Sequence, residues 1–394
     1  MNKKEVQELR RRFRKEKSTI RKMCGCYVNG DGERITSFRE TFAMLSEEEQ
    51  DKYFEIFKKG MSGSFGHNLF CTEFGEAQDA EGNPCENLQE LFLKLRDSEL
   101  EDDALLDEFY ERVIAAYGYR DNYLILLAHD SYDVPQRTSD GYEMEDASED
   151  VYSYVLCLLC PVNLTDYDIC YDAQSHSFRN TNRRWKLEQP MHAMLFPMFT
   201  DRMSDITGAL FYSKDAKDIR TDMLASLIGS ITPISARGQR EIFGAIVEET
   251  LGGKCEYDDV RSIQDILSDR IEESKDAPEP LVFSKAELSE LLSDSGVSEE
   301  SMQRFDMVYD SVLPQERPLQ ATNIIDTKKM EVKLEGIKIT AKPERARLVT
   351  TRRIDGRNCL VIPIDDEEVF VNGIAIAGGN ENSSMEGDDE KEDA

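Results

Sequence analysis

Apolar and polar positions follow different periods along the chain, and these periods predict its elements. Over residues 1–120 apolar residues recur every three to four positions, the period of an amphipathic helix, in the stretches 3–23, 46–60, 86–97 and 101–117. Ser46 and Glu49 form a capping-box signature at the start of the second stretch. Short apolar runs at 26–28 and 67–74 predict strands. We therefore expect an N-terminal α/β region over 1–120.

From residue 121 the pattern changes to continuous apolar runs. Residues 122–129 (NYLILLAH) and 151–162 (VYSYVLCLLCPV) have strand length and polar flanks, which is typical of strands covered on both faces. Shorter strand patterns follow at 166–172, 175–180 and 192–199, and a long acidic loop is expected over 130–150. We predict a central, mostly antiparallel sheet over 121–215 with flanking helices.

The remaining chain divides into a helical part and a β part. Helical periodicity returns at 216–229, 236–251, 259–273, 284–293 and 298–311, which predicts a helical segment over 216–315. Residues 329–340 alternate strictly, and Asp355-Gly356 and Asn372-Gly373 are hairpin-turn signals, so 316–377 is predicted to be a small all-β domain. Residues 378–394 form an acidic tail of low complexity, predicted to be disordered. The fold class expected is α+β.

Composition limits the cellular compartment and the classes of protein that fit this sequence. Of the 394 residues 40% are apolar, enough for sizeable cores, but no apolar run approaches the ~20 residues of a membrane helix. The charged N-terminus lacks the apolar stretch of a secretory signal. The nine cysteines are scattered and odd in number, which argues against a disulfide scaffold. We expect a cytoplasmic protein with reduced thiols and no membrane partner.

Charge is distributed unevenly. The chain carries −31 in total, yet residues 1–23 carry +7 and residues 336–357 carry +5. Basic segments on an acidic chain can bind the phosphates of a polyanion, and the arginines expected to do so are Arg10, Arg11, Arg12, Arg14, Arg345, Arg347 and Arg353. The last three share one face if 344–354 is an unbroken strand. Alternatively, the N-terminal helix docks on the acidic body of its own chain.

One stretch offers an enzymatic alternative. In LFPMFTDRMSDITGALFYSK, Asp201 and Asp205 would share a face if 200–206 were one helical turn, and they could then hold a divalent ion. Arg202 or Lys214 would steer a phosphate, with His129 and Asp130 as further candidates at a strand end. The competing interpretation is a salt-bridged turn between buried strands.

Other motifs are weaker. Cys157 and Cys160 have a zinc-like spacing but fall in a strand, where residues three apart point to opposite faces, so we predict no metal there. The glycines of KKGMSGSFGHN match no phosphate-loop spacing and follow a predicted helix, so a helix cap at Gly60 is favoured. We expect no cofactor.

The segments GCYVN, LILLAHDSYDVP, YVLCLLCPV and LFPMFTDRMSDITGALFYSK together resemble a family of uncharacterised cytosolic proteins of Gram-positive bacteria, domain of unknown function 4317. The resemblance extends from Met1 to about Ala377 and implies no activity, cofactor or catalytic residue.

Three functional hypotheses follow. The leading one is a non-enzymatic cytosolic protein that binds RNA or a ribonucleoprotein through segments 1–23 and 336–357. The second is a metal-dependent phosphoester or nucleotide hydrolase centred on Asp201 and Asp205. The third is a structural or regulatory protein that binds a protein partner, with the N-terminal helix docked on its own chain.

Overall fold

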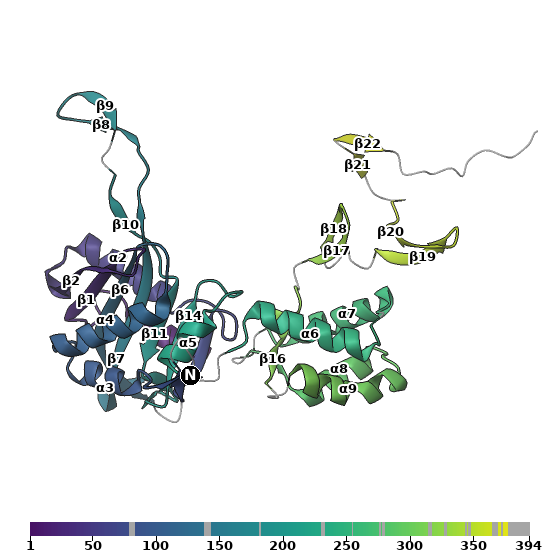
Figure 1. Cartoon of the computed structure of the whole chain (residues 1–394), viewed down its shortest axis with the longest axis horizontal. Helices are drawn as coiled ribbons and strands as arrows, with labels where there is room; N and C mark the ends of the chain where they lie inside the picture. Colours follow the sequence, from purple (N-terminus) through teal and green to yellow (C-terminus); the bar gives the residue numbers. More distant parts are fainter. Residues whose placement is uncertain are drawn as a thin grey trace, which may run out of the picture.

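The computed structural model comprises a sheet lobe, a helical lobe, a projecting arm and a series of C-terminal hairpins (Figure 1). It describes residues 1–78, 83–137, 143–180, 183–229, 233–253, 255–275, 277, 280–313, 317–326, 329–342, 345, 348–364, 369–371 and 373–376. The mixture of helices with a large antiparallel sheet confirms the α+β class.

The sheet lobe is built on one antiparallel sheet in the order β2-β1-β6-β7-β11-β14-β3, with β10 also paired to β7. Its strands are β1 (Lys22–Val28), β2 (Arg34–Thr41), β3 (Leu69–Glu73), β6 (Tyr123–Arg137), β7 (Glu143–Leu164), β10 (Trp185–Leu187), β11 (His192–Phe196) and β14 (Gly208–Ser213). The predicted central sheet is thus completed by β1, β2 and β3 from the first 120 residues. The expected acidic loop instead continues the β6–β7 ladder, and residues 138–142 of it lie outside the described residues.

Helices cover both faces of this sheet, which explains the continuous apolar runs. Ile125 and Leu127 of β6 face α3 (Gln89–Asp97), α4 (Asp103–Tyr117) and α5 (Thr221–Leu227). The alternate residues Leu124 and Leu126 face α1 (Lys3–Arg10), the 3-10 helix η1 (Phe42–Met44) and α2 (Glu47–Gly60). Since a central strand is buried on both sides, its polar–apolar alternation disappears.

The N-terminal helix is shorter than predicted. The expected helix over 3–23 ends at Arg10, and the chain turns before β1 begins at Lys22. The predicted apolar stripe is nevertheless buried, because Phe13 and Ile20 pack into the cluster around α2. Beyond the helix, Arg12 and Thr19 are held by contacts with Asp130 in β6.

The helical lobe contains α6 (Ala236–Thr250), α7 (Tyr257–Glu273), α8 (Lys285–Asp294), α9 (Glu299–Val312) and α10 (Ala321–Ile324), with a short ladder of β15 (Val282–Phe283) and β16 (Leu319–Gln320). Four predicted helices are therefore confirmed within about two residues at each end. Ser284 and Glu287 form a capping box at the start of α8. The helix expected over 216–229 covers only α5, which packs on the sheet instead.

The glycine-rich loop after α2 joins the two lobes. Asn323 of α10 donates a 2.6 Å hydrogen bond to the carbonyl of Gly66, and its side-chain oxygen lies 2.9 Å from His67 Nδ1. Gly66 has φ +69°, and a Cβ there would lie 1.8 Å from Gln320 Oε1. The positive φ, together with the nearby Gln320 side chain of the helical lobe, explains this glycine.

The remaining strands form isolated two-stranded ribbons. Beyond β7 the chain continues into β8 (Ile169–Asp172) and β9 (Ser177–Asn180), which form the tip of the projecting arm (Figure 1). At the C-terminus β17 (Met330–Leu334) pairs with β18 (Ile337–Ala341), β19 (Thr350–Ile354) with β20 (Arg357–Val361), and β21 (Val369–Val371) with β22 (Ile374–Ile376). Smaller ladders are β4 (Ala77–Gln78) with β5 (Pro84–Cys85), and β12 (Met198–Thr200) with β13 (Met203–Asp205).

Two predicted C-terminal features can be followed in these hairpins. Asp355 and Gly356 occupy the turn between β19 and β20 with φ of 49° and 78°, as the sequence predicted. Asn372 and the predicted tail 378–394 lie outside the described residues. Within the described part of the chain, no helix is long and apolar enough to cross a membrane.

Candidate polyanion-binding site

The N-terminal segment is fixed to the sheet lobe through Asp130. The Asp130 side chain is 1% exposed and accepts hydrogen bonds from the Thr19 backbone N–H at 2.8 Å, from the Thr19 hydroxyl, and from Tyr154 Oη at 2.9 Å. Arg12 Nη2 lies 3.6 Å from the same carboxylate. Asp130 thus joins residues 12–19 to the middle of the sheet.

Arg12 points into the protein and is not available to an external ligand. It donates a 2.9 Å hydrogen bond to the Ser131 carbonyl, its guanidinium lies 4.3 Å from the centre of the Tyr132 ring, and its side chain is only 11% exposed. Arg12 is therefore docked on its own chain, as in the alternative hypothesis drawn from the sequence. It anchors the segment to the sheet lobe.

Arg202 provides a second attachment for the same segment. Asp201 and Arg202, with φ of 52° and 63°, form the two-residue turn between β12 and β13, so the helical turn expected over 200–206 is wrong. Arg202 Nη1 donates to both carboxylate oxygens of Glu8 at 2.6 Å, and Nη2 donates to the Pro135 carbonyl at 2.8 Å. The salt-bridged turn, considered from sequence as the competing interpretation, is what the structure contains.

The other candidate catalytic residues do not converge. Asp205 accepts hydrogen bonds from the Thr207 N–H and hydroxyl at 3.0 and 2.6 Å; burial raises its pKa, but these hydrogen bonds outweigh that effect and the pKa is lowered. Lys214 follows the far end of β14, about 20 Å away along the strand. Asp201 and Asp205 therefore share no helical face, and Lys214 is remote from both.

His129 and Asp130 are also separated, because consecutive residues of a strand face opposite ways. His129 Nε2 lies 2.8 Å from Ser153 Oγ, and burial lowers the pKa of this imidazole. Cys157 and Cys160 likewise belong to the cores on opposite faces of the sheet, as expected from their strand position. Within the described ranges, no group of three or more His, Cys, Asp or Glu is placed to hold a metal ion.

The exposed arginines of the N-terminal segment gather around a basic pocket. This surface pocket of about 370 Å³ is lined by Gln7, Arg10, Arg11, Arg14 and Lys58. Arg11 and Arg14 are exposed, and the nearest carboxylate to Arg14 is that of Glu16, at 4.0 Å. Arg10 Nε is buried without a hydrogen-bond partner among the described residues. A pocket with four cationic side chains and an unpaired guanidinium N–H suits a phosphate group.

The basic pocket adjoins a larger cleft between the lobes. Gln7 and Arg10 also line this cleft of about 480 Å³, with Lys3 on the sheet lobe and Thr322 on the helical lobe. A ligand at the basic pocket therefore has room to extend along α1. Lys58 lies in the last turn of α2, and sequence analysis missed it as a site residue because nothing in the local pattern connects it with α1.

The described part of the second basic island is not one continuous strand face. The expected strand over 344–354 is wrong, because β19 begins at Thr350 and Arg345 is helical. Arg347 lies outside the described residues, and Arg353 is exposed on β19. Lys338 is bound at 2.7 Å by Glu331, whose pKa is lowered to about 2 by its hydrogen bonds with Lys333 and Lys338.

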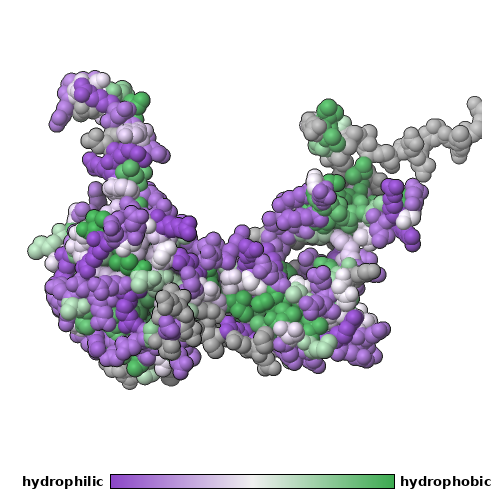
Figure 2. All heavy atoms as spheres, in the orientation of Figure 1, coloured by the Kyte–Doolittle hydropathy of each residue, from purple (hydrophilic) through white to green (hydrophobic). Residues whose placement is uncertain are grey.

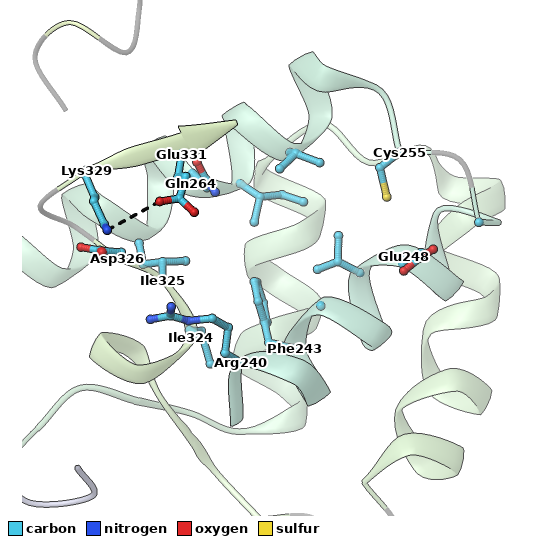
Figure 3. Close-up of a pocket in the computed structure, with 15 residues that line it drawn as sticks. Arg240, Phe243, Glu248, Cys255, Gln264, Ile324, Ile325, Asp326, Lys329 and Glu331 are labelled. Carbon is cyan, nitrogen blue, oxygen red and sulfur yellow. Dashed lines mark ion pairs between the residues drawn. The ribbon is translucent and has the colours of Figure 1, made fainter. Parts of the chain in front are cut away.

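The helical lobe has a pocket of a different kind (Figure 3). It measures about 580 Å³, and Phe243, Ile324 and Ile325 contribute apolar surface to it. Its cations are partly engaged: Lys329 lies 3.7 Å from Glu331, and Arg240 Nε donates to the Asn323 carbonyl at 3.3 Å. The basic pocket at α1 is therefore better suited to a phosphate than this one.

A match over most of its length shows the family to which the chain belongs. Residues 1–374 match the family described as Domain of unknown function (DUF4317), which confirms the resemblance drawn from the sequence. Comparison with curated proteins finds no match.

Proposed function

We propose that this protein is a non-enzymatic binding protein for a polyanion, RNA or a ribonucleoprotein, and that its N-terminal segment makes the phosphate contacts. The single observation that carries the proposal is the basic pocket formed by Arg10, Arg11, Arg14 and Lys58 on a chain of net charge −31. The acidic surface of the protein repels polyanions in general, so a cluster of exposed cations favours binding of an anionic ligand at that one place.

The anchoring contacts support this assignment. Arg12 and Arg202 are used internally, with Asp130, Tyr132 and Glu8 as their partners, and they hold the segment in place. Arg11 and Arg14 are then presented outward from a fixed backbone. Prior fixation of the contacting groups reduces the entropy that binding would otherwise cost.

The test is binding of a fluorescent 20-nucleotide RNA, measured by anisotropy over a range of salt concentrations. The double variant Arg11→Ala/Arg14→Ala should bind about tenfold more weakly at ~50 mM salt, and the slope of log K against log salt should decrease by about 1.4. Lys94→Ala/Arg237→Ala removes the same charge from exposed positions on α3 and α6 and is the matched control.

The control variant should retain the affinity and the salt slope of the unmodified protein. Equal losses in both double variants would show that only net charge matters and would refute the assignment of the pocket. Absence of RNA binding by the unmodified protein at micromolar concentration would refute the function itself.

A further inference from the structure

The arm, residues 164–180 and 183–187, projects from the sheet lobe as two limbs of the chain that pair at its base and at its tip (Figure 1). At its base Trp185 pairs with Leu164 and Lys186 with Asn163, so the arm is a continuation of β7. At its tip β8 and β9 pair from Ile169↔Asn180 to Asp172↔Ser177. Its attachment through the central strand β7 gives the arm a firm origin, while its tip is surrounded by solvent.

The arm is mostly hydrophilic, with apolar patches near its tip and its base (Figure 2). Five large hydrophobic side chains on it are more than half exposed: Tyr167 (68%), Ile169 (71%), Tyr171 (57%), Phe178 (70%) and Trp185 (56%). Trp185 is the single tryptophan of the chain. Exposed apolar residues gathered on one element are typical of a binding surface.

The tip hairpin has an aromatic face. Tyr171 and Phe178 are directly opposed across the two strands, with ring centres 5.6 Å apart, and Ile169 lies two positions away on the same face. Cys170 and Arg179, a second opposed pair, occupy the other face. The tip therefore offers two neighbouring rings on one side and a cation on the other.

Basic residues are interleaved with these aromatics on the returning limb. The sequence of residues 177–187, SFRNTNRRWKL, has four basic residues and no acidic one. Phe178 precedes Arg179, and Trp185 stands between Arg184 and Lys186. Lys186 is itself paired with Glu188 at 3.0 Å, which leaves Arg179 and Arg184 as the cations beside these two rings. The guanidinium of Arg183 lies 5.2 Å from the centre of the Tyr167 ring, as in a cation–π contact. The aspartates of the arm, at 166, 168 and 172, are all on the outgoing limb.

We propose that the arm binds single-stranded nucleic acid, with bases stacked on Tyr171, Phe178 and Trp185 and phosphates held by the basic residues of the returning limb. This inference rests on the proposed polyanion-binding function and adds a preference for unpaired strands. Alternating rings and cations suit a strand that offers both bases and phosphates. A protein-binding surface of this size would have few charges at its centre. Here Phe178 and Trp185 have basic neighbours in the sequence, and the Arg183 guanidinium lies against the Tyr167 ring.

The experiment uses Trp185 as its own probe in the full chain. Addition of a 20-nucleotide poly(U) strand should quench the tryptophan emission at micromolar concentration and ~50 mM salt. Tyr171→Ala/Phe178→Ala should weaken binding of this strand by at least about 25-fold, since each stacked base contributes ~5- to 140-fold in affinity. Binding of a duplex RNA of the same length should be unchanged.

Two controls make the outcome decisive. Met44→Ala/Met307→Ala removes two side chains that are 87% and 71% exposed outside the arm, and it should bind both RNAs normally. The substituted positions are all on the surface, and circular dichroism checks that each variant folds. Unchanged tryptophan emission, or equal weakening for strand and duplex, would overturn the inference and leave the aromatic face as a protein-docking surface.

The two proposals fail separately. If Arg11→Ala/Arg14→Ala weakens RNA binding but the arm variant does not, the arm inference is wrong and the basic pocket stands. If only the arm variant weakens binding, the phosphate contacts are not those of the basic pocket, and the arm is the principal site.

Discussion

Replacement of Asp130 by alanine tests how the N-terminal segment is held. The substitution removes the acceptor for the Thr19 backbone N–H, the Thr19 hydroxyl and the Tyr154 hydroxyl, and it removes the countercharge of Arg12. Asp130 is 1% and Arg12 11% exposed, so little solvent is available to replace what is lost. We expect the segment from Arg12 to Thr19 to detach from the sheet.

The expected cost follows from these contacts. Removing one partner of a buried ion pair typically costs about 3 to 5 kcal/mol, because the other charge is left uncompensated. Arg12→Ala should cost less, about 1 to 2 kcal/mol, since Asp130 then keeps its bonds from Thr19 and Tyr154. In the double variant the two losses should not add, and a coupling free energy of about 1 kcal/mol or more is expected.

Hydrogen exchange of the full chain, followed by mass spectrometry, measures the loss of local stability in the N-terminal segment. The measurement does not require two-state unfolding of both lobes. In Asp130→Ala, peptides covering residues 12–28 should lose about two to three and a half orders of magnitude in protection, while peptides of α8 and α9 remain unchanged. A loss below about fivefold, or strict additivity with Arg12→Ala, would refute the role given to Asp130.

Three further predictions concern other contacts. Burial lowers the pKa of His192 to about 4, so the unfolded state binds more protons than the folded state between pH ~6.5 and ~4, and the free energy of unfolding falls as the pH drops through this window. Between pH 7 and 5, His192→Gln should therefore lose about 2 kcal/mol less of its free energy of unfolding than the unmodified protein, as measured by urea titration. An identical pH dependence of the two proteins would contradict this. Gly66→Ala should loosen the contact between the lobes, because the added methyl group would clash with Gln320. Proteolysis around residues 61–68 should become faster, while the hydrogen exchange of β6 stays the same. Unchanged proteolysis would argue against a close approach of the lobes at this glycine. Arg202→Lys should raise hydrogen exchange of α1 about fivefold or more, since a lysine cannot bind both oxygens of Glu8; equal exchange would mean the ion pair does not hold α1.

The elements that sequence analysis predicted well have local causes. The apolar runs at 122–129 and 151–162 reflect strands covered on both faces, and Ser46 is the cap of α2. These signals are complete within about ten residues. The opposed positions of Cys157 and Cys160 were predictable for the same reason, since strand geometry alone decides them.

The errors have distant causes. The helix expected over 3–23 ends at Arg10, and the segment beyond it is held by contacts of Arg12 and Thr19 with Asp130, more than a hundred residues away, which no local pattern records. The Asp201–Arg202 turn places two side-chain-bearing residues at positive φ, where Asn-Gly is the usual sequence signal. For the candidate site, the basic segment was identified from charge, but which arginines face outward, and that Lys58 joins them, depends on tertiary packing.

The order of strands in the sheet also bears on how the protein forms during synthesis. In the part of the chain that the structure describes, β3 pairs with β14 alone among the strands, and Cys71 pairs with Leu210 at the centre of that ladder. β3 and β14 are about 140 residues apart in the sequence. During synthesis β3 therefore stays unpaired until most of the sheet lobe has left the ribosome. An unpaired strand of this kind is a target for chaperones. A pause in translation before β14 should prolong the time for which β3 is exposed.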